Sequence, residues 1–369
     1  MSAKEWPTWM PLRQALQSLS PYGAPQAPAD AVLNTNENPY APTPALAKAI
    51  ADRIYEVSLN LNRYPDRDAV NLRKGLAKFI NNLSGTSFGA DQIWAANGSN
   101  EIIQSLFMAF GDRPALGFTP SYSMHPLIAK VTGVDWCDGG RREDFSLDVA
   151  KAVGEIAKIK PGLTFITTPN NPTGTTVTLE EISQLAAAAV QSNGLLIVDE
   201  AYAEFSNLPS AVTLISKYPN LIVIRTMSKA FAFAGARLGY LIGDTEVINA
   251  MFLVRLPYHL SSLTQAAAEV ALEFQGELLG TVESLIRSRE SLLSRLEELG
   301  LQVVPSQANF IVFTGFAQTP AQLWRQLLDR GVLIRDVGLL GHLRVTIGNE
   351  AENLKFIAAL QEILNGESQ

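Results

Sequence analysis

Short apolar runs alternate with helical patterns through the middle of the chain. Residues 163–168, 195–199 and 221–225 are rich in β-branched side chains and almost continuously apolar. This pattern is typical of strands that are buried on both faces, as the strands of a parallel sheet are. Residues 92–96 form a similar run, followed by a polar turn and a helical pattern, and predict a fourth strand.

The segment between the first two of these strands is predicted to be a helix with readable ends. Thr178 and Glu181 have the spacing of a capping box, and Asn193-Gly194 favours the left-handed turn that ends a helix. Strand, helix and strand within about 35 residues form a βαβ unit. The sequence therefore predicts an α/β fold in which helices flank a mostly parallel central sheet.

The pattern changes after about residue 275. Residues 277–299 have the periodicity of a long, charged amphipathic helix that Gly300 ends. Beyond it, helices alternate with short predicted strands at residues 309–313, 332–335 and 343–347. The first 45 residues are rich in proline and asparagine, which indicates an extended arm. We therefore expect an N-terminal arm (1–45) that packs with the small domain, a large domain (46–275) and a small α+β domain (276–369).

Composition and charge argue against several classes of protein. The net charge of -7 is unfavourable for binding nucleic acid, because clustered lysines and arginines hold phosphate backbones. No apolar run approaches the roughly 18 residues of a membrane span, and residues 1–17 lack the unbroken apolar stretch of a secretory signal. The single Cys137 cannot form an intrachain disulfide. We therefore expect a cytoplasmic protein with no nucleic-acid or membrane partner.

The chain contains three histidines, His125, His259 and His342, whose spacing does not match that of metal ligands. We therefore expect neither a catalytic nor a structural metal. We expect all three to be ordinary structural or pocket-lining residues, and His259, near the predicted pocket, is the first candidate for an exception.

Polar groups follow three of the predicted strands at the point where each strand ends. Asn171 comes after the first strand, Asp199 ends the second and Lys229 follows the third, at intervals of 28 and 30 residues. In an open parallel sheet, ligands bind at the carboxyl ends of the strands. Residues 98–100, at a predicted helix start, and Arg237 add groups that suit an anion. Each group alone has an ordinary explanation, such as a solvated lysine or a helix-capping aspartate. Their order and spacing make coincidence the weaker explanation.

Pyridoxal phosphate (PLP) needs groups of this kind. Its aldehyde needs a lysine amine, its ring nitrogen a buried carboxylate, and its phosphate the backbone N–H groups of a helix start beside a fixed cation. A phenol and an amide, such as those of Tyr202 and Asn171, can hydrogen-bond its ring oxygen. The sequence therefore predicts a PLP enzyme in which Lys229 holds the cofactor.

The motifs around these residues resemble those of the fold-type I aminotransferases. They are NNPTG (170–174), DEAY (199–202) and SKAFAFAGARLGY (228–240), in this order. Further stretches narrow the resemblance to the class II histidinol-phosphate aminotransferase family: LNTNENPY (33–40), RYPDRDAVNLR (63–73), WAANGSNEIIQ (94–104), TPSYSMHP (119–126), RLPYHLSSLTQAA (255–267), LIRDVG (333–338) and LRVTIG (343–348). The resemblance extends over nearly the whole chain, and RLPYHLSS resembles the actinobacterial branch. Asn100 stands where many relatives have aspartate, and Ala41 where many have glycine.

The resemblance implies a role for each candidate residue. Lys229 would hold PLP as a Schiff base and shuttle the proton, Asp199 would pair with the ring nitrogen, and Tyr122 would stack on the ring. Asn171 and Tyr202 would hold the ring oxygen. The residues implied to bind the cofactor phosphate are Gly98, Ser99, Asn100, Thr226, Ser228 and Arg237, with Tyr64 from the neighbouring subunit of a homodimer. The residues implied to line the substrate pocket are Tyr22, Asn36, Arg335 and Arg344.

The implied reaction is reversible amino transfer between L-histidinol phosphate and 2-oxoglutarate in histidine biosynthesis, with imidazole acetol phosphate and L-glutamate on the other side. Two alternatives share almost every cofactor residue: an aromatic amino-acid aminotransferase, and a PLP-dependent decarboxylase of a phosphorylated amino acid. A third alternative is a non-catalytic, cofactor-sensing module fused to a DNA-binding head. We do not favour it, because the first residues show neither a helix-turn-helix pattern nor a basic segment.

Overall fold

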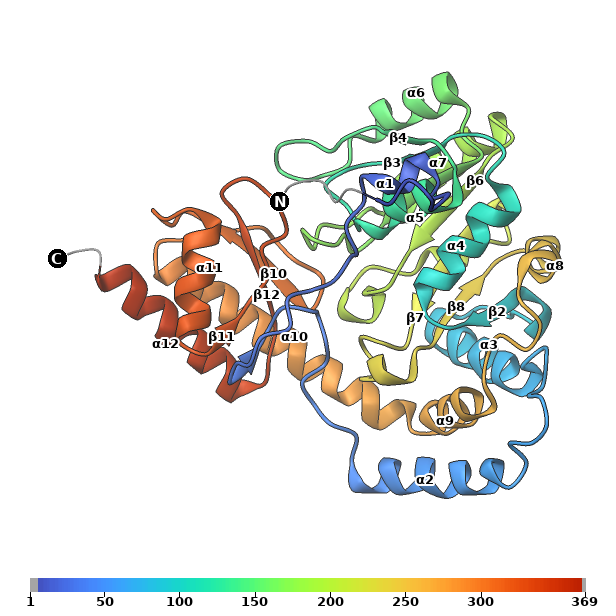
Figure 1. Ribbon diagram of the computed structural model, residues 1–369, viewed down its shortest axis with the longest axis horizontal. Coiled ribbons are helices and arrows are strands. Elements are labelled where there is room, and N and C mark those ends of the chain that lie inside the picture. The colour runs from blue at the N-terminus through green and yellow to red at the C-terminus, as the bar shows by residue number, and fades with distance from the viewer. Residues whose placement is uncertain (1–5, 367–369) are drawn as a thin grey trace.

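The computed structural model describes residues 6–366, and a seven-stranded sheet forms the centre of its larger part (Figure 1). The strand order is β2-β8-β7-β6-β5-β3-β4. The strands from β7 to β4 are parallel, whereas β8 is antiparallel to both of its neighbours. In sheet order the bounds are Ile93–Ala96, Gly239–Ile242, Leu221–Thr226, Leu195–Asp199, Leu163–Thr167, Ala115–Gly117 and Trp136–Asp138.

The strands predicted from apolar runs are all present. β2, β5, β6 and β7 have bounds that differ from the predicted ones by at most one residue at either end. Every residue of β5 and β7 is buried, which explains why their sequences are continuously apolar rather than alternating. The α/β fold class is therefore confirmed. The strands β3, β4 and β8 were not predicted, because runs of three or four residues are too short to show a pattern.

Helices cover both faces of this sheet. Ile197 and Ile222 pack on one face against α4 (Ser99–Phe110), α5 (Met124–Thr132) and α8 (Thr245–Val254). Their neighbours Val198 and Val223 pack on the opposite face against α3, α6 and α7. The bounds of these helices are Val70–Ser84, Val149–Ile159 and Leu179–Gln191. Outside α3 lie α9 (Ser262–Glu273) and then α2 (Pro44–Ser58). The result is a three-layer arrangement with the core on both sides of the sheet.

The ends of α7 are those predicted from its sequence. The Thr178 hydroxyl accepts a hydrogen bond from the Glu181 amide at 3.3 Å, and the Glu181 carboxylate accepts one from the Thr178 amide at 2.8 Å. Beyond the helix, Asn193 adopts the left-handed conformation with φ of 51°. The capping box and the helix stop are therefore confirmed, because both depend on residues close together in the sequence.

The C-terminal part is built on a second, smaller sheet. After the long helix α10 (Gln275–Glu298), Gly300 has φ of 77°, as expected for a residue that ends a helix. The sheet is antiparallel with the order β12-β10-β9, at Leu343–Thr346, Phe310–Thr314 and Gln302–Val303. Helices α11 (Pro320–Asp329) and α12 (Glu350–Gly366) pack against each other beside it. Figure 1 shows α10 running from α9 to this sheet.

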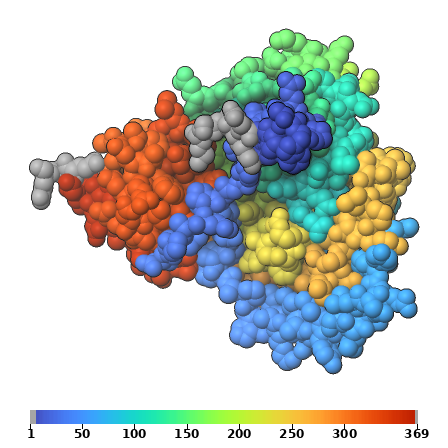
Figure 2. Space-filling view, viewed as in Figure 1, coloured from blue at the N-terminus to red at the C-terminus, as the bar shows by residue number. Residues whose placement is uncertain are grey.

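The N-terminal segment crosses from one part of the molecule to the other. After the short helix α1 (Gln14–Gln17), β1 (Ala31–Val32) pairs in parallel with β11 (Val332–Leu333). The strand predicted at residues 332–335 is therefore shorter than expected, and beyond it Arg335 forms an isolated antiparallel bridge with Arg344. The Thr346 amide then donates to the Leu33 carbonyl at 2.9 Å. Figure 2 shows this segment, in blue, lying across the line where the two parts meet. The arm, the large domain and the small domain, with boundaries at residues 45 and 275, stay predictions.

Short 3₁₀ helices complete the secondary structure at Ala90–Gln92, Ala203–Phe205, Ala211–Leu214 and Ala234–Ala236. Within residues 6–366, no helix is long and apolar enough to cross a membrane. The same residues contain no group of three or more histidine, cysteine, aspartate or glutamate side chains placed to hold a metal ion.

Candidate active site

A cavity of about 330 Å³ lies at the carboxyl edge of β5, β6 and β7. The ends of these strands, the start of α4, the N-terminal arm and residues 335–337 all contribute to its wall. The structure brings most of the predicted site residues together here. Those that line the cavity are Tyr22, Asn36, Ser99, Asn100, Tyr122, Asn171, Asp199, Tyr202, Thr226, Ser228, Lys229, Arg237, Arg335 and Arg344.

Lys229 presents its amine to this cavity directly after β7. The Nζ atom donates to the Thr35 carbonyl of the N-terminal arm at 2.9 Å. Removal of the amine from water lowers the pKa of Lys229 to about 8, and the positive charges of Arg344 and Arg237 act in the same direction. A larger fraction of this amine is therefore neutral near pH 7 to 8 than for an ordinary lysine. Only the neutral amine is a nucleophile.

Asp199 is the last residue of β6, and its carboxylate is buried. Its Oδ1 accepts from the Ala201 amide at 3.1 Å, and its Oδ2 lies 3.2 Å from Nε2 of His125. His125 is itself buried on α5 and meets the ring of Tyr122 edge-on, with 5.5 Å between the ring centroids. The carboxylate is therefore held on both oxygens, which fixes its direction.

The histidine that contacts a cavity residue is His125, which lies behind Asp199 without lining the cavity itself, and not His259. The ring of His259 stacks on Trp94 at 5.5 Å, its Nε2 lies 2.9 Å from the Ala95 carbonyl oxygen, and it does not line the cavity. Sequence reasoning did not separate His125 from the other histidines. A usable signal was present, because His125 follows Tyr122 by three residues and that spacing places both on one side of a helical turn.

Two amide side chains converge on the phenol of Tyr202. The hydroxyl oxygen accepts from Nδ2 of Asn36 at 2.9 Å and from Nδ2 of Asn171 at 3.3 Å. Burial raises the pKa of Tyr202 to about 12, so the phenol keeps its proton at neutral pH. Asn36 is fixed in turn by Thr346, whose hydroxyl donates to its Oδ1 at 3.1 Å. The phenol therefore has a fixed position and a hydrogen that it can donate to a bound acceptor.

Two arginines of the C-terminal part provide positive charge with unused donors. Arg344, on β12, donates to Oδ1 of Asn171 at 2.6 Å and to the Asn34 carbonyl at 2.9 Å, and burial lowers its pKa to about 10. Its Nε and the Nη1 of Arg335 are buried without a hydrogen-bond partner. No carboxylate within residues 6–366 forms an ion pair with either guanidinium. Such a pair suits an anionic ligand.

A second anion cradle lies at the start of α4. Gly98 has φ of 84°, and a Cβ atom there would lie 2.7 Å from Nη2 of Arg237. A Cβ atom on Gly239 would lie 2.5 Å from the amide nitrogen of Ser99. The positive φ of Gly98 disfavours a side chain there, and a side chain at residue 239 would collide with the backbone at the start of α4, so glycine at both positions keeps the helix amides uncovered. Gly98 therefore shapes this cradle without lining the cavity itself.

Hydroxyl and amide groups complete the wall around the cradle. The Thr226 hydroxyl accepts from the Ser228 amide at 3.1 Å and donates to the Leu238 carbonyl at 3.2 Å. The Tyr122 hydroxyl donates to Oδ1 of Asn100 at 3.1 Å. The side chain of Asn100 therefore orients the Tyr122 ring, in addition to the phosphate-binding role that the resemblance implies for this residue.

Tyr64 is the one predicted site residue that lies far from this cavity. Its side chain is 79% exposed and stacks on Tyr258, with 4.3 Å between the ring centroids and 14° between the planes. The structure therefore leaves Tyr64 available to another molecule and gives it no contact with its own site.

A buried charge cluster lies behind the turn that carries Asp199 and Tyr202. Arg225 donates to the Glu200 carboxylate through Nε at 2.9 Å, and its Nη1 lies 2.8 Å from Oε1 of Glu204. All three side chains are buried, and burial raises the pKa of Glu204. Residues 200 and 204 thus anchor the turn on one side, while residues 199 and 202 project into the cavity. We call this group the Arg225 cluster.

Several cavity residues were not predicted from the sequence. They are Ala24, Asn34, Thr35, Ser121, Ser123, Thr167, Pro169, Pro172, Ala201, Asp336 and Val337. Thr35 matters most among them, because its carbonyl oxygen is the acceptor for the Lys229 amine. A backbone acceptor leaves no signal in residue type, so sequence reasoning had no means of finding it.

The residues around the cavity fit PLP part by part. The Lys229 amine suits an aldehyde, and the buried Asp199 carboxylate suits a protonated ring nitrogen. The donors converging at Tyr202 suit a ring oxygen, and the cradle formed by Gly98 and Arg237 suits a phosphate. The unused donors of the C-terminal arginines remain for a second anion.

Comparisons with known proteins agree with this geometry. Residues 30–360 match the family described as aminotransferase class I and II. The chain is 52% identical to the histidinol-phosphate aminotransferase of Mycolicibacterium smegmatis over 98% of this chain and 95% of that protein. It is 51% identical to the protein of the same name from Mycobacterium marinum, over 96% and 92% of the two chains.

Solved structures show the same fold. The histidinol-phosphate aminotransferase of Clostridium acetobutylicum is 26% identical, with a TM-score of 0.81 over 90% of this chain and 98% of that chain. The enzyme of that name from Sinorhizobium meliloti, solved in complex with pyridoxal-5'-phosphate, is 24% identical, with a TM-score of 0.84 over 97% and 99% of the two chains. The chain therefore belongs to the PLP-dependent class I and II aminotransferases and, within them, to the histidinol-phosphate aminotransferase family.

Proposed function

We propose that the chain exchanges an amino group between L-histidinol phosphate and 2-oxoglutarate in histidine biosynthesis, with PLP held at Lys229. The observation that carries this proposal is the pair Arg335 and Arg344, whose unused donors lie in the same cavity as the Lys229 amine. The pair provides a place for the anionic group of a substrate close to the amine-bearing centre.

The residues around the cofactor have different chemical roles. When bound, PLP supplies an electron sink for the carbon that carries the amino group. Asp199 would hold a proton at the ring nitrogen, and Asn171 and Tyr202 would orient the ring through its oxygen. Tyr122 would stack on the ring. Ser99, Asn100, Thr226, Ser228 and Arg237 would hold the phosphate, and the Lys229 amine would move the proton at the substrate carbon.

The substrate pair explains why arginine is used at the other end of the cavity. L-histidinol phosphate has a phosphate monoester beside its amino-bearing carbon, whereas 2-oxoglutarate has planar carboxylates. A guanidinium can make two parallel hydrogen bonds to either kind of anion, whereas a lysine offers a point charge. Arg335 and Arg344 therefore bind both substrates in turn, and Tyr22 and Asn36 complete the wall around the rest of the substrate.

Arg335→Leu tests the anion role. We expect the KM for L-histidinol phosphate to rise about 10- to 100-fold, because a buried charge-assisted bond is lost, while bound cofactor is retained. The KM for L-histidinol, which carries neither a phosphate nor a carboxylate, should rise much less. Arg330→Leu is the matched control, because Arg330 lies on the same part of the chain and pairs with Glu362 away from the cavity.

The same assay separates the alternative functions. Initial rates are measured with L-histidinol phosphate, phenylalanine and phosphothreonine under identical conditions. Equal losses for the phosphorylated and the phosphate-free amine would favour an aromatic amino-acid aminotransferase, with Arg335 in a structural role. Release of carbon dioxide from phosphothreonine without amino transfer would favour a decarboxylase.

An exposed apolar surface around Tyr64 supports a homodimer. Tyr55, Leu59, Leu253 and Leu256 are all between 68% and 86% exposed. Exposed apolar groups of this extent mark an interface with another protein. We infer that a second copy of the chain covers this surface and that Tyr64 reaches the cofactor phosphate of the partner subunit. The cytoplasmic location and the division into arm, large domain and small domain stay predictions.

Mixing two variants tests the shared site, at a PLP concentration too low to fill the Tyr64→Phe site. Tyr64→Phe and Lys229→Ala each damage a different half of it, so a mixed dimer has one site with both native residues. After complete exchange of equal amounts, about a quarter of all sites should be native, and the activity should recover to that level. Subunit exchange is demonstrated by co-purification of two differently tagged subunits. No recovery after proven exchange would contradict the shared site.

A further inference from the structure

The stacked pair Tyr64 and Tyr258 is held by two segments that are distant in the sequence. The rings are 79% and 40% exposed, so burial contributes little to their position. Tyr258 also has φ of 57°, a left-handed conformation that a non-glycine residue rarely adopts. An exposed pair with this backbone keeps one orientation only if the segments beneath it are fixed to each other.

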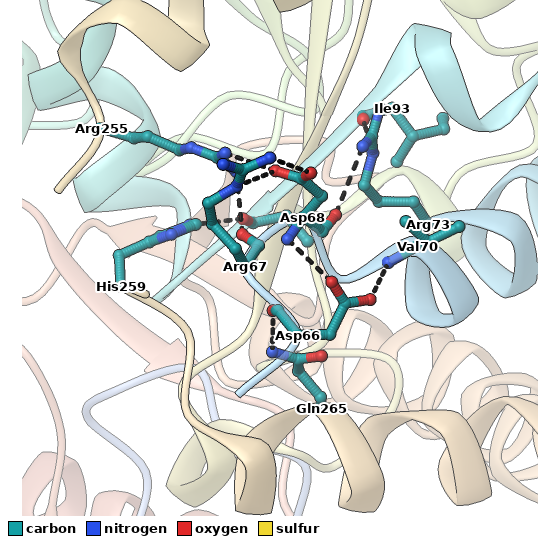
Figure 3. Close-up of polar contacts among 10 residues, drawn as sticks. Asp66, Arg67, Asp68, Val70, Arg73, Ile93, Arg255, His259 and Gln265 are labelled. Atoms are coloured by element: carbon teal, nitrogen blue, oxygen red, sulfur yellow. Dashed lines mark hydrogen bonds and ion pairs between the residues drawn. The ribbon is translucent and has the colours of Figure 1, made fainter. Parts of the chain in front are cut away.

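Arg255 makes that connection, as Figure 3 shows. Its Nη2 forms an ion pair with Oδ1 of Asp68, and its Nη1 donates to the Arg67 carbonyl at 2.9 Å. The guanidinium also lies over the ring of Phe252, 4.3 Å from the centroid. The Arg255 side chain is only 9% exposed. One partly desolvated cation thus links the segment ending in Tyr258 to the segment that begins at Tyr64.

The Asp68 segment is in turn fixed to the body of the protein. The Asp66 carboxylate accepts from the amides of Asp68 and Val70 at 3.0 and 2.9 Å, at the start of α3. Arg73 donates to the carbonyls of Asp68 at 3.3 Å and Ile93 at 2.7 Å, so it joins α3 to β2. Figure 3 shows these contacts side by side with the Arg255 pair.

The charge of Asp68 persists throughout the physiological range. Hydrogen bonds from Arg67 and then from Arg255 lower the pKa of Asp68 to about 2. The two arginines differ in setting, because the Arg67 side chain is 62% exposed and that of Arg255 is 9% exposed. An exposed ion pair contributes little, whereas a partly buried one with several hydrogen bonds constrains geometry. Arg67 is therefore a matched control for Arg255.

We propose that Asp68 and Arg255 are positioning residues that hold Tyr64 and Tyr258 in the orientation in which Tyr64 enters the site of the partner subunit. The inference rests on the shared site proposed above. Neither residue lines the cavity of its own chain. Their effect must therefore pass through the tyrosine pair to a site on the other copy.

The first test measures cofactor binding. In the Arg255→Gln holoenzyme, equilibrium dialysis should give a dissociation constant for PLP about 10-fold higher than in the native protein, because the phosphate loses a well-placed phenol. Asp68→Asn should give the same change, which keeps the inference testable if one variant folds poorly. Arg67→Gln should stay within about twofold of native. An unchanged dissociation constant in both folded Arg255 and Asp68 variants overturns the inference.

The second test asks which subunit carries the defect. Two kinds of mixed dimer are purified by means of two affinity tags. Each dimer contains one native Lys229. In the first, Arg255→Gln and Lys229→Ala are on different chains, so the competent site receives Tyr64 from a chain with native Arg255. In the second, both substitutions are on one chain. We expect native PLP affinity at the competent site of the first dimer and the roughly 10-fold weaker affinity in the second.

The outcomes separate this inference from the proposal beneath it. Tyr64→Phe is tested in the same two arrangements. Suppose that Tyr64→Phe weakens PLP binding at the site of the other subunit, whereas Arg255→Gln weakens it at the site of its own subunit. The positioning role is then wrong and the shared site is supported. If neither defect passes, both proposals fall.

Discussion

We expect Lys229→Ala to reduce transamination by more than about 10⁴-fold and to leave the fold intact, because one substitution removes both the amine that holds the cofactor and the group that moves the proton. The structure explains why folding should tolerate the change. The Lys229 amine has been removed from water, and the Thr35 carbonyl is its one hydrogen-bond acceptor within residues 6–366. Loss of a desolvated cation with so few contacts costs little stability.

The measurement combines rates with chemical labelling. Native protein should be yellow, and borohydride should fix the cofactor to the peptide that contains Lys229. The variant should show neither property and should keep the native circular dichroism spectrum and melting temperature. Lys217→Ala, a change at an exposed lysine, is the control and should behave like the native protein. A label on any other lysine would show that the assignment is wrong.

We expect Asp199→Asn to reduce kcat by about 10²-fold or more while the cofactor stays bound. Asparagine keeps the shape of the side chain and can still accept from the Ala201 amide, so the turn is preserved. The negative charge that holds a proton on the ring nitrogen is lost. The contact with His125 survives only if the amide and the imidazole adopt matching donor and acceptor roles.

Turnover and cofactor content are measured on the same preparation, so that loss of the electron sink is distinguished from loss of the cofactor. Asp135→Asn removes a carboxylate from the surface and serves as the control for the change in charge. A near-native rate for Asp199→Asn with full cofactor occupancy would refute the role of the carboxylate.

The sequence could predict those parts of the site that depend on local patterns. β5, β6 and β7 are continuously apolar because both of their faces are buried, so their ends were located to within a residue. The carboxyl ends of parallel strands share one edge, which placed Asn171, Asp199 and Lys229 together. The capping box of α7 was equally visible because it is local.

Other parts of the site depend on packing that leaves no local pattern. His125 reaches Asp199 across 74 residues of sequence, and the Thr35 carbonyl reaches Lys229 across 194. The backbone of the N-terminal arm supplies that carbonyl, so the identity of residue 35 carries no information about it. Tyr64 could be singled out only by its motif, because its expected target lies on another copy of the chain. The catalytic and binding roles remain predictions that the experiments above address.

The Arg225 cluster has a consequence for how the sequence can change over time. Loss of Arg225 alone leaves the buried carboxylates of Glu200 and Glu204 without a cation and lowers the stability by about 3–5 kcal/mol. Replacement of all three charged residues together by apolar residues can leave the stability almost unchanged. A single substitution within the Arg225 cluster therefore gives a destabilised protein, so the effects of substitutions at the three positions depend on one another. Homologues should keep them or exchange them as a set, so their covariation would mark this turn even in relatives whose substrates differ.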